Sequence, residues 1–151
     1  MKLVLILNFF IAVYFTLNNS VLASINIDEN LTHLDISKDT LIANIKREVL
    51  ITDENIAQIN FQPNQNNSLA LGYNNDKSLI QFIVTNKSFK DLNFFIYLNS
   101  INGLLKLYSK SKDTPLHLEN FSGTDIPYKH RPYPSLNGAV KFSIKAQESK
   151  T

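Results

Sequence analysis

The side chains that could carry out catalysis are scattered along the sequence. His33, His117 and His130 lie far apart without metal-ligand spacing, and the chain contains no cysteine. A serine nucleophile would need a sharp G-x-S-x-G turn, and the one Ser–Gly pair, Ser122-Gly123, lacks that frame. The sequence therefore predicts no catalytic residue, no metal site and no cofactor, and it does not predict an enzyme.

Two pairs of adjacent carboxylates, Asp28-Glu29 and Asp53-Glu54, do not change this conclusion. Neighbouring residues of a strand point to opposite faces, so two such carboxylates cannot act on one bond. We expect both pairs to be solvated loop ends.

One short segment, residues 128–134 (YKHRPYP), concentrates aromatic and basic side chains. Tyr128, Lys129, Arg131 and Tyr133 would offer stacking faces and cationic donors to an anionic glycan or a phosphate. The alternative is a proline-stiffened loop whose tyrosines cover the edge of the core. The sequence leaves both interpretations open.

Composition limits the class of protein. A length of 151 residues predicts one domain, and 44% apolar against 19% charged residues favours a packed core over disorder. The net charge of +2 is too small to indicate a nucleic-acid partner. The lack of cysteine excludes zinc fingers and a disulfide framework.

The first 23 residues have the three parts of a secretory signal peptide. Lys2 is followed by an apolar run at residues 3–17, and small or short side chains precede a cleavage site after Ala23. A membrane anchor is the alternative, but fifteen helical residues span roughly 22 Å, less than the bilayer core of about 30 Å. We therefore expect export and a mature chain of residues 24–151.

Short strands separated by turn clusters predict the fold. Val140, Phe142 and Ile144 alternate with Lys141 and Ser143, which is typical of a half-buried strand. Other strands are expected at residues 57–61, 69–73, 79–85, 93–98, 105–107 and 116–118. Because no strand–helix alternation is present, the pattern favours an all-β, antiparallel sandwich.

Residues 37–51 fit two structures. Ser37 could cap a helix, whereas in a strand one face would carry Leu41, Ala43, Ile45, Val49 and Ile51. The many β-branched residues favour the strand. Residues 24–40 before it would form an N-terminal extension, either a flexible arm or a strand without a partner in its own chain.

Taken together, export and these strands resemble the alpha-class (CFA/I-like) subunits of chaperone–usher fimbriae. The resemblance covers residues 45–146. It is carried by residues 45–56 (IKREVLITDENI, with a turn at Asp53), 68–73 (SLALGY), 94–98, 115–118 and 136–146 (LNGAVKFSIKA). Their order and spacing match the family, although no single motif is specific.

The resemblance implies an immunoglobulin-like β-sandwich at residues 41–151 that lacks one strand. A neighbouring subunit would supply that strand, so the chain would form a homopolymer through strand exchange. The donor face would be Leu41, Ala43, Ile45, Val49 and Ile51. The implied partners are a periplasmic chaperone and an outer-membrane usher, and the implied destination is a cell-surface fimbria used for adhesion. The alternative is a self-complete secreted or periplasmic α+β domain, with residues 37–51 helical, that binds a ligand or an envelope partner.

Overall fold

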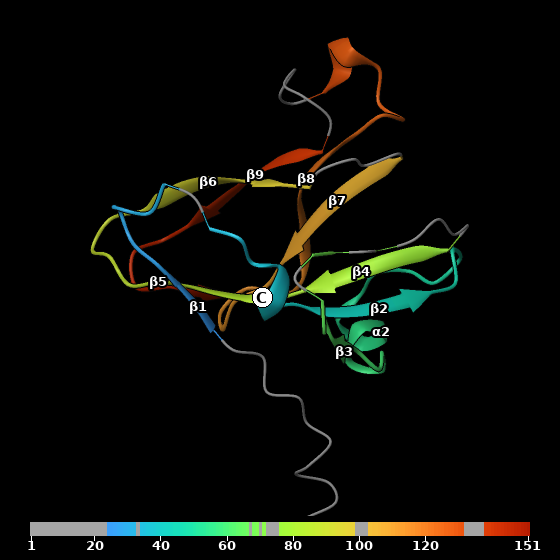
Figure 1. The fold of residues 1–151 in the computed structure, drawn as a ribbon, viewed down its shortest axis with the longest axis horizontal. Helices are drawn as coiled ribbons and strands as arrows, with labels where there is room; N and C mark the ends of the chain where they lie inside the picture. Colours follow the sequence, from blue (N-terminus) through green and yellow to red (C-terminus); the bar gives the residue numbers. More distant parts are fainter. Residues whose placement is uncertain are drawn as a thin grey trace, which may run out of the picture.

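The computed structural model describes residues 24–32, 34–66, 68–69, 71, 76–98, 103–131 and 138–151 (Figure 1). In these residues the fold is all-β, with ten short strands and one α-helix of five residues. The all-β prediction is confirmed. The predicted signal peptide, residues 1–23, lies outside the described residues.

The elements are numbered in their order along the chain. The strands are β1 (Ser24–Ile27), β2 (Leu41–Ile45), β3 (Gln62–Pro63), β4 (Lys77–Gln81), β5 (Ile83–Asn86), β6 (Leu92–Tyr97), β7 (Leu104–Ser109), β8 (His117–Gly123), β9 (Ala139–Ile144) and β10 (Ser149–Lys150). The helix is α2 (Asp53–Ala57), and two 3-10 helices are η1 (Ser37–Asp39) and η2 (Tyr128–His130).

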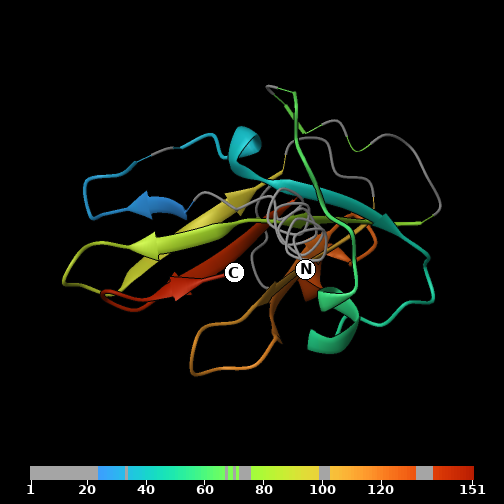
Figure 2. The same cartoon turned by 90° about the horizontal axis from the view of Figure 1, so that it is seen from below.

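The strands form four small sheets. Their orders are β1-β5-β10, β3-β2-β4, β6-β9 and β7-β8. Every described pair is antiparallel except β1 with β5, which is parallel. Figure 2 shows β1 beside β5 from below.

The core lies where the β1-β5-β10 sheet faces the β6–β9 pair (Figure 1). The inward residues of β9 are buried as the alternation predicts, while Ser143 on the other face is exposed. The buried cluster consists of Ile25, Ile27, Val84, Phe142 and Ile144. Burial of one face explains why β9 was identifiable from its period of two.

The prediction that the N-terminal extension, residues 24–40, has no partner in its own chain is wrong for its first four residues. Residues 24–27 form β1, which has a partner in its own chain because it pairs with β5 from Ser24↔Ile83 to Ile27↔Asn86. Ile25 and Ile27 are buried in the core. The extended segment therefore contributes to the folded body and is not a free arm.

Residues 37–51 contain a strand, so the helical alternative is wrong. The strand is shorter than predicted: β2 holds Leu41, Ala43 and Ile45, whereas Val49 and Ile51 lie after its end. Three consecutive charged residues, 46–48, would place a charge on the buried face of a longer strand. The chain turns instead, and Val49 N donates to Lys46 O at 3.1 Å.

Other predicted strands differ too. Residues 57–61 are not a strand: Ala57 ends the helix α2, and residues 58–61 form a turn and an irregular segment. The helix begins at Asp53, and its N-cap Thr52 accepts a hydrogen bond from Asn55 N at 3.2 Å. A cap and two acidic residues in the first turn favour a helix. Residues 79–85 are divided at Phe82 into β4 and β5, which belong to different sheets. Leu69 and Leu71 are not in a strand, and the other residues of 69–73 lie outside the described residues.

Candidate functional site

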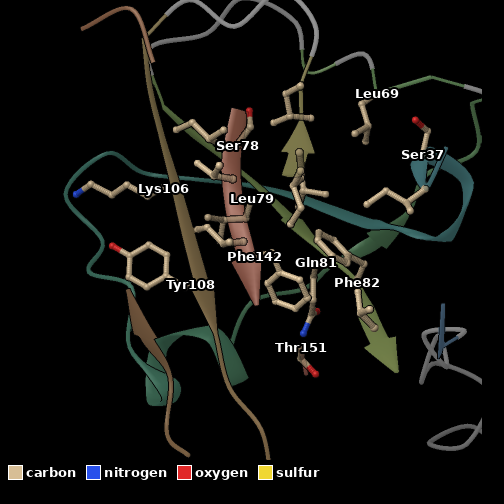
Figure 3. Close-up of a pocket in the computed structure, with 18 of the residues that line it drawn as sticks. Ser37, Leu69, Ser78, Leu79, Gln81, Phe82, Lys106, Tyr108, Phe142 and Thr151 are labelled. Carbon is tan, nitrogen blue, oxygen red and sulfur yellow. The ribbon is translucent and has the colours of Figure 1, made fainter. Parts of the chain in front are cut away.

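An apolar cavity of about 860 Å³ lies between β4 and β7 (Figure 3). Its walls come from all four sheets and from the connections that follow β2 and β3. Leu79, Leu105, Leu107, Val140 and Phe142 are among the apolar residues that line it. The cavity therefore connects with the core through Phe142, which also belongs to the buried cluster.

The cavity runs along the edges of two strands. Four consecutive residues of β4, 78–81, and four of β7, 105–108, line it. Successive side chains of a strand point to opposite faces, so a cavity that touches four in a row borders the edge of the strand. In Figure 3, Lys106 and Tyr108 lie on the side of β7 away from Phe142, as this arrangement requires.

Those two edges have no strand beside them in the described part of the chain. β4 is the last strand of its sheet, and β7 pairs with β8 alone. An edge strand presents a row of backbone N–H and C=O groups that are ready to pair with another strand. The site therefore combines apolar walls with two unpaired strand edges.

The size of the cavity is within the range of ligand pockets. Such pockets typically measure about 300–1,000 Å³, and this one, at about 860 Å³, lies toward the upper end. The cavity is partly open to solvent, so apolar side chains that enter it would remove its apolar walls from water, which is favourable by about 25 cal/mol per Å² of apolar surface buried.

The lining also carries ionisable side chains, Asp35, Lys106, Lys110 and Lys150, among its apolar residues. Among the described residues, no group of three or more His, Asp or Glu side chains could hold a metal ion. In the same part of the chain, no helix is long and apolar enough to cross a membrane.

The predicted donor residues lie in three different surroundings. Leu41 and Ala43 are buried in β2, with Ile45 at its end, and β2 is paired on both sides by β3 and β4. Val49 lies in the following loop, where its carbonyl accepts a hydrogen bond from Lys77 Nζ at 2.6 Å. Ile51 lines the cavity. The structure thus brings together the first three residues but not the last two.

The predicted glycan or anion contact lies in and after η2. Tyr128 is 65% exposed, and the Arg131 guanidinium carbon lies 6.0 Å from its ring centroid. Arg131 Nε also donates to Ile126 O at 2.8 Å. Lys129 is exposed, and Tyr133 lies outside the described residues. The structure therefore joins Tyr128 to Arg131 and places neither on the cavity.

The cavity itself was not predicted from the sequence. Leu79 and Leu105 were recognised as strand residues, but alternation gives the same pattern in central and edge strands. A sequence signal for an unpaired edge would have been charged or proline residues along it, and Lys77 and Lys106 alone give a weak one.

Comparison with known proteins finds no matching protein-family model, no matching curated protein and no matching solved structure. The class that the structure itself defines is an all-β domain of small, mostly antiparallel sheets with an apolar cavity along two strand edges.

Proposed function

We propose that this protein is a structural subunit of a surface fimbria used for adhesion. Its fold is an incomplete immunoglobulin-like sandwich, and a strand from a neighbouring copy completes it. The observation that carries this proposal is the apolar cavity bordered by the edges of β4 and β7.

A strand suits this cavity better than a small apolar ligand. A hydrocarbon chain could fill the volume, but it has no donors or acceptors for the backbone groups of β4 and β7. An added strand supplies both, and its alternate side chains can enter the apolar interior. Strand edges and apolar walls at one place therefore favour β-strand addition.

The first strand, rather than the second, is the best candidate donor. β2 is held on both sides, whereas β1 pairs along one side only. β1 has four residues, and none of the residues described between it and β2 at Leu41 belongs to another strand. Ile25 and Ile27 are already buried in their own core, so their transfer to the neighbour's cavity would exchange one apolar environment for another. This assignment moves the proposed donor from residues 41–51 to the segment that begins at Ser24.

Exchange of β1 would link copies from head to tail. Such a contact does not close on itself and produces filaments. The same cavity would accept a temporary strand from a periplasmic chaperone before an outer-membrane usher assembles the fibre. Export through the secretory pathway would precede both steps.

A reversible lock on β1 tests the proposal. Asn26 and Thr85 are directly opposed in the β1–β5 register, and paired strands lie about 5 Å apart, within the range a disulfide accepts. The test uses residues 24–151 with Asn26→Cys and Thr85→Cys. Oxidation should form a disulfide that keeps β1 paired with β5 of its own chain and stops polymerisation, and reduction should restore polymerisation. The chain has no other cysteine to interfere.

A second cysteine pair controls for the chemistry. Asn93 and Ser143 are opposed in the β6–β9 register and are exposed, so Asn93→Cys with Ser143→Cys should polymerise whether oxidised or reduced. Size-exclusion chromatography with light scattering measures the masses. A wild-type chain that stays monomeric at every concentration, or a locked chain that polymerises normally, would overturn the proposal.

A further inference from the structure

A short loop between β5 and β6 presents a phenylalanine to solvent. Phe89 is 91% exposed, more than any other large apolar side chain described. A fully exposed aromatic ring contributes nothing to the stability of its own fold, whereas aromatic rings are enriched at protein interfaces. The loop therefore has the composition of a contact point.

The loop is held rigidly by a buried amide. Asn86 is fully buried, and its Nδ2 donates to Lys90 O at 2.8 Å and to Lys145 O at 2.9 Å. Its Oδ1 accepts from Ser88 N at 2.9 Å and from Ser88 Oγ at 2.8 Å. From the other side, Gln147 Nε2 donates to the carbonyls of residues 87 and 88, at 2.8 Å each. An ordered loop loses little entropy when it binds, so Phe89 is preorganised for a partner.

Phe89 lies at the end of the molecule from which β1 would swing out. The loop occupies the left end in Figure 1, and Lys87 N donates to Ile27 O, the last residue of β1, at 2.9 Å. β4 and β7, which border the cavity, lie on the opposite side of the molecule (Figure 1). A copy that donates β1 into the next cavity therefore carries Phe89 toward that neighbour.

The neighbour offers an exposed apolar patch beside its cavity. Leu104 and Phe121 are 50% and 39% exposed. They share a face of the β7–β8 pair, because Leu104 is opposite Gly123 and Lys106 is opposite Phe121. Leu104 precedes Leu105, which lines the cavity. An apolar knob at one end and an apolar patch at the other are complementary in the way that a head-to-tail contact requires.

We propose that Phe89 is the docking side chain of the contact between subunits and that it packs on Leu104 and Phe121 of a second copy. This inference rests on the proposed function, because strand exchange brings the two ends together. The ring adds affinity and sets the orientation of consecutive copies, while the strand provides the main linkage.

Substitutions in residues 24–151 test the contact through the concentration at which half of the chains have polymerised. Phe89→Ala should raise it roughly 10- to 100-fold, as expected for the loss of one buried aromatic ring, and Phe89→Leu should raise it less. Phe95→Ala removes a ring that is 58% exposed on β6 and serves as the matched control, with no change expected. The melting temperature of unpolymerised Phe89→Ala should equal that of the wild type.

The receiving patch gives an independent check. Leu104→Ala should also raise the concentration at which half of the chains have polymerised. The double variant Phe89→Ala with Leu104→Ala should raise it less than the two single effects combined, because both substitutions remove the same contact. If the wild type polymerises and Phe89→Ala does so at the same concentration, the docking role is wrong and strand exchange stands. If the wild type does not polymerise, strand exchange is wrong, and the docking role of Phe89 is then wrong as well.

Discussion

Removal of the amide of Asn86 should destabilise the folded chain markedly. Asn86→Ala removes hydrogen bonds to several partners. Two of these partners keep another bond: Lys145 O still accepts from Glu148 N, and Lys90 O still accepts from Ser88 Oγ. Ser88 N loses its acceptor while the residue is buried. Lost bonds cost about 1 kcal/mol each, and an orphaned buried donor costs about 1–3 kcal/mol. Three lost bonds and one orphaned donor together predict a loss of about 4–6 kcal/mol.

Urea unfolding followed by circular dichroism measures this loss as a lower midpoint with an unchanged slope. In a thermal scan, the melting temperature should fall by about 10 °C or more. Asn93→Ala is the matched control, because Asn93 is exposed and its Oδ1 accepts one hydrogen bond, from Ser143 Oγ at 2.8 Å. That change should cost under about 1 kcal/mol. A loss below about 1 kcal/mol for Asn86→Ala, or an equal loss for both, would refute the reasoning.

Three further substitutions have clear expected outcomes. Gly123→Ala should cost several kcal/mol in urea unfolding, because Gly123 has a φ of +127° and an added Cβ would lie 2.0 Å from Gly103 O; a neutral result would contradict the close approach of β7 and β8. Ser109→Ala should leave stability unchanged or raise it by up to about 1 kcal/mol, because its buried Oγ has no hydrogen-bond partner among the residues that the structure describes, and a lower melting temperature would count against this. Lys150→Met should cost about 2–3 kcal/mol, because the mostly buried Glu119 loses the Lys150 Nζ that lies 2.6 Å away and keeps the more distant His117 Nε2, at 3.9 Å; adding Glu119→Gln should recover part of the loss in a double-mutant cycle.

The sequence was most informative where one face of an element is buried. β9 could be predicted because Val140, Phe142 and Ile144 all point to the core. β2 was predicted too long because apolar Val49 and Ile51 continue its pattern, whereas the charged turn ends it. The helix α2 was missed because it has five residues, too few to show a period of 3.6.

The candidate site depends on which strands are neighbours, and local patterns do not contain that information. Leu79 and Leu105 have the same alternation whether another strand lies beside them or a cavity does. For the same reason, the sequence pattern assigns Leu41 and Ala43 to a donor face, although pairing on both sides places them inside a sheet. The exposure of Phe89 could not be predicted from the sequence either, because it depends on the loop conformation that the hydrogen bonds of Asn86 fix.

The position of β5 between the first and the last strand has a kinetic consequence. Thr85 lies 61 residues after Ser24 and 64 residues before Ser149, the residues whose hydroxyls bond to its own. Contacts between such distant segments are slow to form, since a long loop must close before any pairing is gained. During synthesis β1 and β5 are both made before β10, so β5 can pair with β1 while its other edge is still unpaired. The β1-β5-β10 sheet is therefore completed only when the last strand has been made.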